Sequence, residues 1–267
     1  MAKVSVIMGV CNCASTIDAA IRAIENQTFT DWELILCDDA SQDRTASIAQ
    51  SWVERDGRIL LLRNAENRGL GYALNRCLRR ASGEYIARMD GDDDCLPERF
   101  AEEVDFLDSH PEFSFVSTAM TLFDETGDWA VLENPADPTI EDVLRGTPVF
   151  HAPAMFRRIC LEAVGGYNDE EAIRRAEDVD LWIRLYAAGF RCHNLSLPLY
   201  RMRCDGEAYR RRKYRWRIHE TRVRLAGCAR LGMPPGFYFS AVKPLAAGLV
   251  PWRVRQVIRR SQWRGKP

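Results

Sequence analysis

The sequence predicts an α/β fold in which a mostly parallel sheet is flanked by helices. Short apolar runs alternate with segments of helical periodicity over the first hundred residues, turn signals separate them, and 46% of the 267 residues are hydrophobic. The apolar runs predict strands at Val4–Met8, Glu33–Cys37, Ile59–Arg63 and Glu84–Met89. Apolar residues three and four positions apart predict the helices between them, at Thr16–Asn26, Thr45–Glu54 and Leu70–Arg80.

The alternation becomes irregular in the second part of the chain. A helix is expected from Pro97 to Leu107, a strand over Phe113–Phe123 and a further helix over Asp178–Ala188. Because no stretch resembles a flexible linker, residues 1–205 are expected to form one domain with two halves, 1–110 and 111–205.

Charge separates the last part of the chain from the rest. Residues 206–267 hold 16 of the 37 Lys and Arg residues but only two of the 38 acidic ones, which gives them a formal net charge of +14 against −15 for residues 1–205. This asymmetry predicts a basic extension over 206–267 whose surface has different partners from the acidic body.

The cysteines and the N-terminus indicate the compartment. The nine cysteines are spread along the chain without a CxxC pair, which does not resemble a disulfide framework and favours a reducing cytoplasm. The first ten residues have a short apolar run without a cleavage site, so they predict a buried strand and not a signal peptide.

The strongest chemical signal is the run Met89-Asp90-Gly91-Asp92-Asp93-Asp94 at the end of the fourth predicted strand. Parallel sheets open toward ligands at this end of their strands. Gly91 lets the backbone turn so that Asp90 and Asp92 reach one hard cation, and oxygen ligands suit Mg²⁺ or Mn²⁺. The alternative, an acidic cap on the following helix, fits Asp93 and Asp94.

Two further segments belong to the same predicted sheet edge. Asp38 and Asp39 follow the second strand, where they either accept hydrogen bonds from a ribose or base or form a turn. Arg68 precedes the third helix, where its guanidinium either meets phosphate oxygens or is a surface arginine. Together with the aspartate run, they predict a nucleotide pocket with a base end and a diphosphate end.

A third acidic constellation opens the helix predicted from Asp178. We expect Asp178, in preference to Glu177 and Asp180, to act as a catalytic base because a helix start is a rigid seat; the alternative is that the three carboxylates only complement the helix dipole. Trp182 on this helix is a core residue or a wall of an acceptor site.

These segments together resemble the family-two inverting glycosyltransferases. The resemblance covers residues 3 to about 203 in order, through VSVIMGVCN, LILCDDAS, NRGLGYALN, MDGDDDCLPERF, HAPAMFRR, GGYN and AEDVDLWIRL. It implies a GT-A fold, with residues 1–110 as the nucleotide-sugar-binding half and 111–205 as the acceptor-side half. It also implies a nucleotide-sugar donor and a divalent cation, Mn²⁺ or Mg²⁺.

The resemblance assigns roles to individual residues. Its Asp-x-Asp element matches Asp90 and Asp92, with Gly91 between them at the donor. Its base-contacting aspartate matches Asp39, its diphosphate arginine resembles Arg68, and its Glu-Asp base element matches Glu177 and Asp178.

The chain also departs from the family pattern. Gly9-Val10-Cys11-Asn12 lacks the aromatic ring that many members place beside the base, although Val10 is still expected at the donor. Arg203 stands where many members have a metal-binding histidine. Either carboxylates and phosphates alone bind the metal or Arg203 neutralises the leaving diphosphate, and we expect the second. His151 matches a family histidine on the acceptor side, with a structural role as its alternative.

The basic extension indicates what kind of acceptor the protein uses and where in the cell the protein is located. Residues 231–252 are apolar but contain four prolines, so a segment lying on an anionic membrane surface fits better than a spanning helix; a helical cap on the domain is the alternative. The Arg-rich segment lacks interleaved base-stacking residues, so no nucleic-acid partner is expected.

The predicted function is inverting transfer of a sugar, from UDP-sugar by preference, to a hydroxyl of a glycan or lipid-linked oligosaccharide in surface polysaccharide synthesis. The expected location is cytoplasmic and peripheral, on the inner face of the plasma membrane. A non-catalytic glycan-binding or scaffold protein of the same fold is the alternative.

Overall fold

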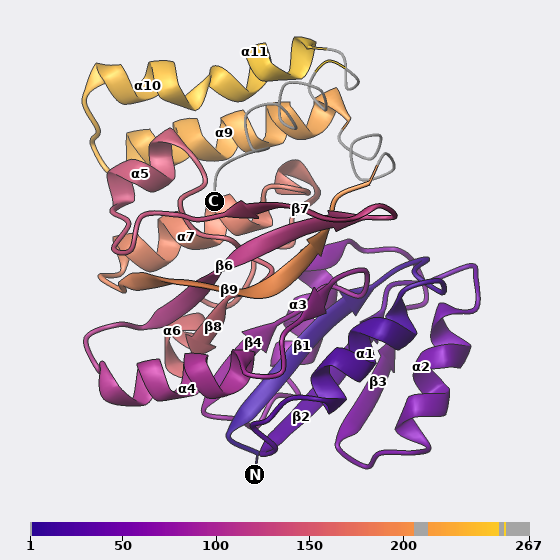
Figure 1. Ribbon diagram of the computed structural model, residues 1–267. Helices are drawn as coiled ribbons and strands as arrows, with labels where there is room; N and C mark the ends of the chain where they lie inside the picture. The colour runs from indigo at the N-terminus through magenta and orange to yellow at the C-terminus, as the bar shows by residue number, and fades with distance from the viewer. Residues whose placement is uncertain (1, 206–212, 251–253, 255–267) are drawn as a thin grey trace.

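A nine-stranded mixed sheet forms the centre of the computed structural model, which describes residues 2–205, 213–250 and 254 (Figure 1). The strand order is β3-β2-β1-β4-β8-β6-β9-β5, and β7 pairs with β6 outside this path. The strands are β1 (Val4–Val10), β2 (Trp32–Asp38), β3 (Ile59–Arg63), β4 (Tyr85–Arg88), β5 (Asp94–Cys95), β6 (Phe115–Asp124), β7 (Gly127–Leu132), β8 (Met155–Arg157) and β9 (Cys192–Arg203).

The first four strands are parallel and aligned at their carboxyl ends. Val10 at the end of β1 pairs with Asp38 at the end of β2, and β1 lies between β2 and β4. The loops that follow these three strands therefore emerge at one edge of the sheet, where the sequence places its aspartate pairs.

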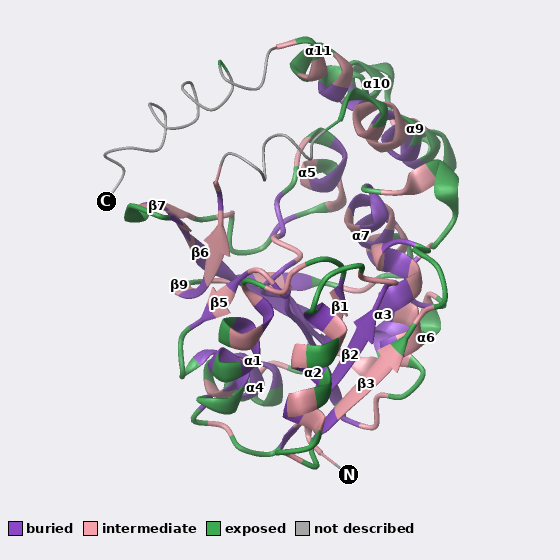
Figure 2. Cartoon of the chain, turned by 90° about the vertical axis from the view of Figure 1, so that its right-hand side faces the viewer, coloured by how far each residue is buried: buried purple, intermediate pink, exposed green. Residues whose placement is uncertain are grey.

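Helices cover both faces of the sheet, so side chains of both faces are apolar. Alternate residues of β1 enter two different cores: Val6 and Met8 pack in the core under α1, α2 and α4, whereas Ile7 packs in the core under α3, α6 and α7. These helices are α1 (Ile17–Glu25), α2 (Thr45–Val53), α3 (Leu70–Leu78), α4 (Arg99–Ser109), α6 (Arg158–Ala163) and α7 (Glu177–Ala187). Figure 2 shows the buried residues on the central strands and on the helix faces turned toward them.

The predicted α/β class is confirmed, and the predicted strands and helices of the first half lie within a few residues of the observed ones. The strands β5, β7, β8 and β9 were not predicted. β5 and β8 carry two and three residues, too few to show a periodicity, and β9 contains Pro198, which argues against a strand in a sequence.

The helices of the C-terminal part form a layer beside α7 and α5 (Ile140–Arg145) (Figure 1). They are α9 (Tyr214–Arg230), α10 (Pro235–Ala241) and α11 (Lys243–Leu249), and a 3-10 turn, η1 (Glu171–Ile173), contacts α9. Arg224 of α9 is buried and donates hydrogen bonds to the carbonyl oxygens of Val143 (2.5 Å) and Gly146 (2.8 Å). Residues 206–212, 251–253 and 255–267 of the predicted basic extension lie outside the described residues.

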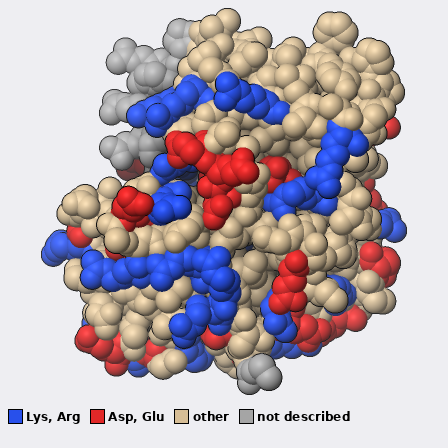
Figure 3. All heavy atoms as spheres, turned by 180° about the vertical axis from the view of Figure 1, so that it is seen from behind, with Lys and Arg blue, Asp and Glu red and all other residues tan. Residues whose placement is uncertain are grey.

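The surface of the molecule carries both signs of charge. On the face seen in Figure 3, a group of acidic side chains lies between two bands of Lys and Arg side chains. Within the described ranges, no helix is both long enough and apolar enough to cross a bilayer.

Candidate active site

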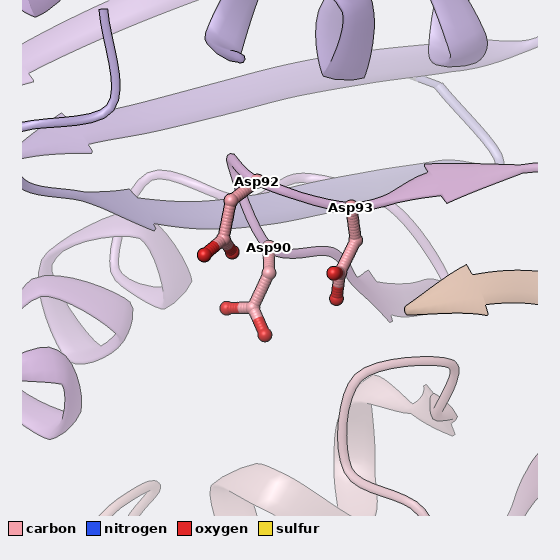
Figure 4. Close-up of side chains that lie close together, drawn as sticks. All are labelled: Asp90, Asp92 and Asp93. Carbon is pink, nitrogen blue, oxygen red and sulfur yellow. The ribbon is translucent and has the colours of Figure 1, made fainter. Parts of the chain in front are cut away.

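Three aspartates of the loop after β4 converge on one point. One carboxylate oxygen each of Asp90, Asp92 and Asp93 lies within 4.8 Å of the others (Figure 4). The loop approaches β1 closely at Gly91, because a Cβ there would lie 2.7 Å from Cγ1 of Val10. Glycine at this position is thus required by the close approach of the two segments.

Asp93 ties this loop to the end of β9. Its carboxylate accepts a hydrogen bond from the Tyr200 hydroxyl at 2.8 Å and another from the backbone amide of Arg203, also at 2.8 Å. Burial, reinforced by the charges of Asp90 and Asp92, raises the pKa of Asp93 well above its usual range. The Arg203 guanidinium in turn donates to the Asp92 carbonyl oxygen at 3.2 Å, which places its positive charge beside the cluster. Its role at a diphosphate stays a prediction.

Asp90 forms an ion pair within the sheet. Both of its carboxylate oxygens accept hydrogen bonds from Arg88, at 2.5 and 2.6 Å. The Arg88 side chain is 4% exposed, whereas that of Asp90 is 30% exposed, so the carboxylate lies on the open side of the pair. Sequence reasoning missed Arg88, although an arginine within the otherwise apolar run Tyr85-Ile86-Ala87 was a signal for it.

The aspartate cluster has the chemistry of a site for a hard divalent cation. Mg²⁺ and Mn²⁺ prefer oxygen ligands, and three converging carboxylates supply them. The residues therefore fit the cation that the sequence predicts, with Asp90 and Asp92 as its protein ligands. This assignment stays a prediction.

Asp39 organises the other end of the site. Its backbone amide bonds to the carbonyl oxygen of Val10 at 2.8 Å. Its carboxylate accepts from the backbone amides of Arg68 at 2.9 Å and Gly69 at 2.7 Å, and from the side chain of Asn64 at 2.7 Å. The end of β2 is thereby joined to the turn before α3, and Val10 lies between this turn and the Gly91 loop.

The structure corrects the expectation for Asp38. Its side chain is 1% exposed, it accepts a hydrogen bond from the Ser41 backbone at 3.3 Å, and it lies 3.7 Å from the Arg63 guanidinium. A carboxylate so buried has no surface for a donor, so Asp38 shapes the turn. Asp39 is itself buried, at 4% exposed, and its carboxylate joins the turn before α3. The base-contacting role of Asp39 itself stays a prediction.

Arg68 has the exposure that a diphosphate ligand needs. Its side chain is about half exposed, stacks over the ring of Tyr72 at 4.7 Å and lies 3.4 Å from the Glu66 carboxylate. A surface pair of this kind is weak, so the guanidinium can exchange Glu66 for another anion.

Asp178 lies half-buried in the first turn of α7. Burial, followed by the adjacent negative charge of Glu177, raises its pKa to about 6. The charges of Asp178 and Asp90 both raise the pKa of Tyr167, so the two carboxylates act on one buried hydroxyl group. That the predicted base and the aspartate loop form one site stays a prediction.

The loop before α7 connects the site to α9. Arg174 donates to the side-chain oxygen of Asn67 and packs over Gly69, where a Cβ would lie 3.1 Å from its Nε. The ring of His219 on α9 bonds to the carbonyl oxygen of Arg174 at 2.9 Å. Glu220 and Arg224 on the same helix also act on Asp178, the first raising and the second lowering its pKa. Sequence reasoning did not link α9 to the base, because helical periodicity does not reveal what a helix packs against.

The two residues expected on the acceptor side, His151 and Trp182, differ in their surroundings. His151 lies 2.9 Å from the Tyr167 hydroxyl, and burial together with the positive charge of Arg88 lowers its pKa well below the usual range, so the ring is neutral. Its acceptor role stays a prediction. Trp182 is 1% exposed and stacks on the rings of Phe115 and Phe156, so the expectation that it walls an acceptor site is wrong and it is a core residue.

Comparisons with known proteins show which proteins this chain resembles. The family model described as glycosyl transferase family 2 matches residues 5–164. EpsE of Bacillus subtilis strain 168, provisionally named a glycosyltransferase, is 40% identical over 250 residues, which is 93% of this chain and 90% of that protein. WfaP of Escherichia coli, named a UDP-Glc:alpha-D-GlcNAc-diphosphoundecaprenol beta-1,3-glucosyltransferase, is 26% identical over 84% of this chain and 86% of its own.

A solved structure shares the fold. The mannosyltransferase PcManGT from Pyrobaculum calidifontis, in complex with GDP-Man and Mn²⁺, superposes with a TM-score of 0.66 at 22% identity, covering 98% of this chain and 80% of that one. The predicted GT-A fold is therefore confirmed. On the family match and the identity to EpsE, the chain belongs to glycosyl transferase family 2.

Proposed function

We propose that this protein is an inverting glycosyltransferase that moves a sugar from a UDP-sugar to a hydroxyl group of a glycan or lipid-linked acceptor in surface polysaccharide synthesis. The observation that carries the proposal is the position of Asp178, a protected carboxylate that shares the neighbourhood of Tyr167 with Asp90 of the aspartate loop. A base and a diphosphate site that face one another are what single displacement at an anomeric carbon requires.

In the proposed reaction, the Asp178 carboxylate takes the proton from the acceptor hydroxyl while that oxygen bonds to the anomeric carbon. The bond from this carbon to the diphosphate oxygen breaks on the opposite face, and the electron pair leaves with the nucleotide diphosphate. Inversion needs one base and no covalent nucleophile. Burial, with the negative charge of the neighbouring Glu177, keeps the pKa of the base raised.

Basic groups complete the donor site. We assign Arg203, beside the aspartate loop, and Arg68, before α3, to the diphosphate. A divalent cation, Mn²⁺ or Mg²⁺, would be bound by Asp92 and Asp90 and would stabilise the charge of the leaving group. The presence of Mn²⁺ together with GDP-Man in the PcManGT complex supports this choice.

The acceptor class follows from a relative and from the C-terminal helices. WfaP is named for a diphosphoundecaprenol acceptor, which is a lipid-linked one. In this chain, α10 and α11 expose large apolar side chains, with Phe239 at 76% and Leu249 at 75%, and residues 206–267 have a formal net charge of +14. Exposed apolar side chains on a basic segment favour an anionic membrane surface.

We therefore place the protein in the cytoplasm, peripherally on the inner face of the plasma membrane, with residues 1–205 as the catalytic domain and 206–267 as the membrane-associating extension. A lipid-linked acceptor would then meet Asp178 near the bilayer. Residues 1–110 bind the donor in this arrangement, and 111–205 face the acceptor.

The test is the release of nucleotide diphosphate from a panel of UDP- and GDP-sugars, with Mn²⁺, Mg²⁺ or a chelator, and with and without a lipid diphosphate-linked N-acetylglucosamine acceptor. We expect release from one UDP-sugar, faster with the acceptor and abolished by the chelator. Binding of glycan without release from any donor would instead support the non-catalytic scaffold, which is the competing function.

A further inference from the structure

The ion pair between Arg88 and Asp90 affects how a cation can bind to the aspartate loop. Asp90 is one of the two carboxylates proposed to bind the cation. Both of its oxygens accept hydrogen bonds from the Arg88 guanidinium, at 2.5 and 2.6 Å. Bidentate pairs of this kind are among the stronger hydrogen-bonded contacts in proteins. A cation that reaches Asp90 must therefore compete with Arg88.

The backbone of Arg88 is fixed on both sides, so the residue does not withdraw easily. Its amide donates to the Ala154 carbonyl oxygen at 2.9 Å, and its own carbonyl oxygen accepts from the buried Arg99 guanidinium, also at 2.9 Å. The guanidinium is enclosed, and Asp90 is the acidic residue within 4 Å of it among the described residues. The other groups that interact with its charge, Tyr200, Tyr167 and His151, are neutral.

Among the residues that the structure describes, Asp90 is thus the carboxylate paired with Arg88, and the charge of Arg175 also acts on Asp90. If Asp90 turns toward a cation, the Arg88 charge is left almost buried without a partner, which is costly unless an anion replaces the carboxylate. If a nucleotide diphosphate arrives without a cation, it meets the crowded charges of Asp90, Asp92 and Asp93. The diphosphate supplies an anion that replaces the Asp90 carboxylate beside Arg88, and the cation neutralises the carboxylates that repel the diphosphate.

We propose that Arg88 is the positioning residue of the donor site, a built-in counter-ion for Asp90 that makes the site bind cation and nucleotide diphosphate together and only weakly bind either alone. Arg88 opposes the cation in the empty protein. Once Asp90 turns away, the freed guanidinium supports the diphosphate. This inference rests on the proposed function, because it presumes a nucleotide-diphosphate donor.

The experiment measures binding of Mn²⁺ to the full-length protein by the electron paramagnetic resonance signal of free Mn²⁺, first alone and then with saturating UDP. Three substitutions of one residue are compared: Arg88→Met and Arg88→Gln remove the charge, and Arg88→Lys keeps it. Arg184→Met is the matched control, since Arg184 is a partly buried arginine 2.6 Å from the Asp180 carboxylate, outside the aspartate cluster. Circular dichroism melts establish that each variant is folded.

We expect Arg88→Met and Arg88→Gln to bind Mn²⁺ alone at least about tenfold more tightly than the wild type, because a positive charge beside the carboxylates is gone. The gain in Mn²⁺ affinity caused by UDP should shrink in both, and by reciprocity so should the gain in UDP affinity caused by Mn²⁺. Arg88→Lys and Arg184→Met should bind Mn²⁺ alone as the wild type does. A merely structural role for Arg88 would weaken Mn²⁺ binding.

The inference is overturned if folded Arg88→Gln binds Mn²⁺ alone no more tightly than the wild type, or if UDP and Mn²⁺ remain equally coupled in both charge-removing variants. Because Arg88→Met and Arg88→Gln differ in polarity, one of them can still serve as the test if the other does not fold. Failure of the proposed function has a separate signature, because a wild-type protein that does not bind UDP in the presence of Mn²⁺ has no nucleotide-diphosphate site.

Discussion

The backbone amide of Arg203 donates a hydrogen bond to the Asp93 carboxylate at 2.8 Å, joining the end of β9 to the loop after β4 across 110 residues of sequence. Tyr200 makes a second contact with the same carboxylate. Asp93 is thus the structural anchor of the aspartate cluster: it fixes the place of Arg203 beside Asp92, where a leaving diphosphate would need a positive charge.

This anchor can be tested at Tyr200. Its hydroxyl donates to Asp93 at 2.8 Å and accepts from the Asp90 amide at 3.2 Å, and the residue is fully buried. Tyr200→Phe should lower the free energy of unfolding by about 1–3 kcal/mol, because it leaves buried polar groups without a partner. Urea denaturation measures this. Tyr72→Phe, at a partly exposed ring on α3, is the control and should change stability little.

Substitution of the predicted base should separate chemistry from binding. Asp178→Asn keeps the shape of the side chain but cannot take a proton, so kcat should fall roughly 10²–10⁴-fold while the donor Kd changes little. The control is Asp180→Asn on the same helix, whose carboxylate pairs with Arg184 at 2.6 Å. Steady-state kinetics and calorimetry with UDP-sugar check both; full turnover by Asp178→Asn would mean that another group is the base.

The pH dependence of the reaction should report the pKa of Asp178. A base acts in its deprotonated form, so kcat/KM should fall about tenfold per pH unit below about 6 and level off above it. Glu220 raises this pKa, and Arg224 lowers it. Glu220→Gln should therefore move the acidic limb to lower pH.

The control for that shift is Glu141→Gln, which breaks an exposed pair with Arg145 on α5. Its pH profile should match that of the wild type. An acidic limb that stays in place in Glu220→Gln would show that the titrating group is not Asp178 or that α9 does not act on it.

Removal of Asp92 should weaken donor binding that depends on the cation. In calorimetry with Mn²⁺, Asp92→Ala should lower UDP affinity by roughly tenfold or more, because the cation loses a ligand. Asp94→Ala is the control, since Asp94 pairs with Arg201 at 2.6 Å and lies outside the converging group. Equal UDP affinity in Asp92→Ala and the wild type would remove Asp92 from the site.

The membrane proposal makes a prediction about two side chains. Replacement of Phe239 and Leu249 by serine should reduce sedimentation with anionic liposomes, with partition at least roughly tenfold weaker, because two large apolar side chains no longer enter the interface. The control is Ile159→Ser on α6, whose side chain is 68% exposed but lies outside the basic extension. Equal loss in all variants, or none in any, would contradict a specific role for α10 and α11.

The sequence by itself determined the class of the fold and the position of its acidic loops. Continuous apolar runs mark β1, β2 and β4 because their alternate residues face two cores, and a parallel arrangement brings the ends of these strands to one edge, where Asp39 and Asp92 follow. This reasoning needs only local patterns and one rule of topology.

Only the tertiary structure decided which partners each of two neighbouring residues contacts. Asp38 and Asp39 are adjacent, chemically alike and both buried, yet Asp38 lies near the Arg63 guanidinium, whereas Asp39 accepts from the backbone of the turn before α3. The pairing of Arg88 with Asp90 and the charges of α9 around Asp178 likewise depend on rotamers and on packing between distant segments. Charge interactions fall off over a few ångströms, so no one-dimensional pattern specifies them.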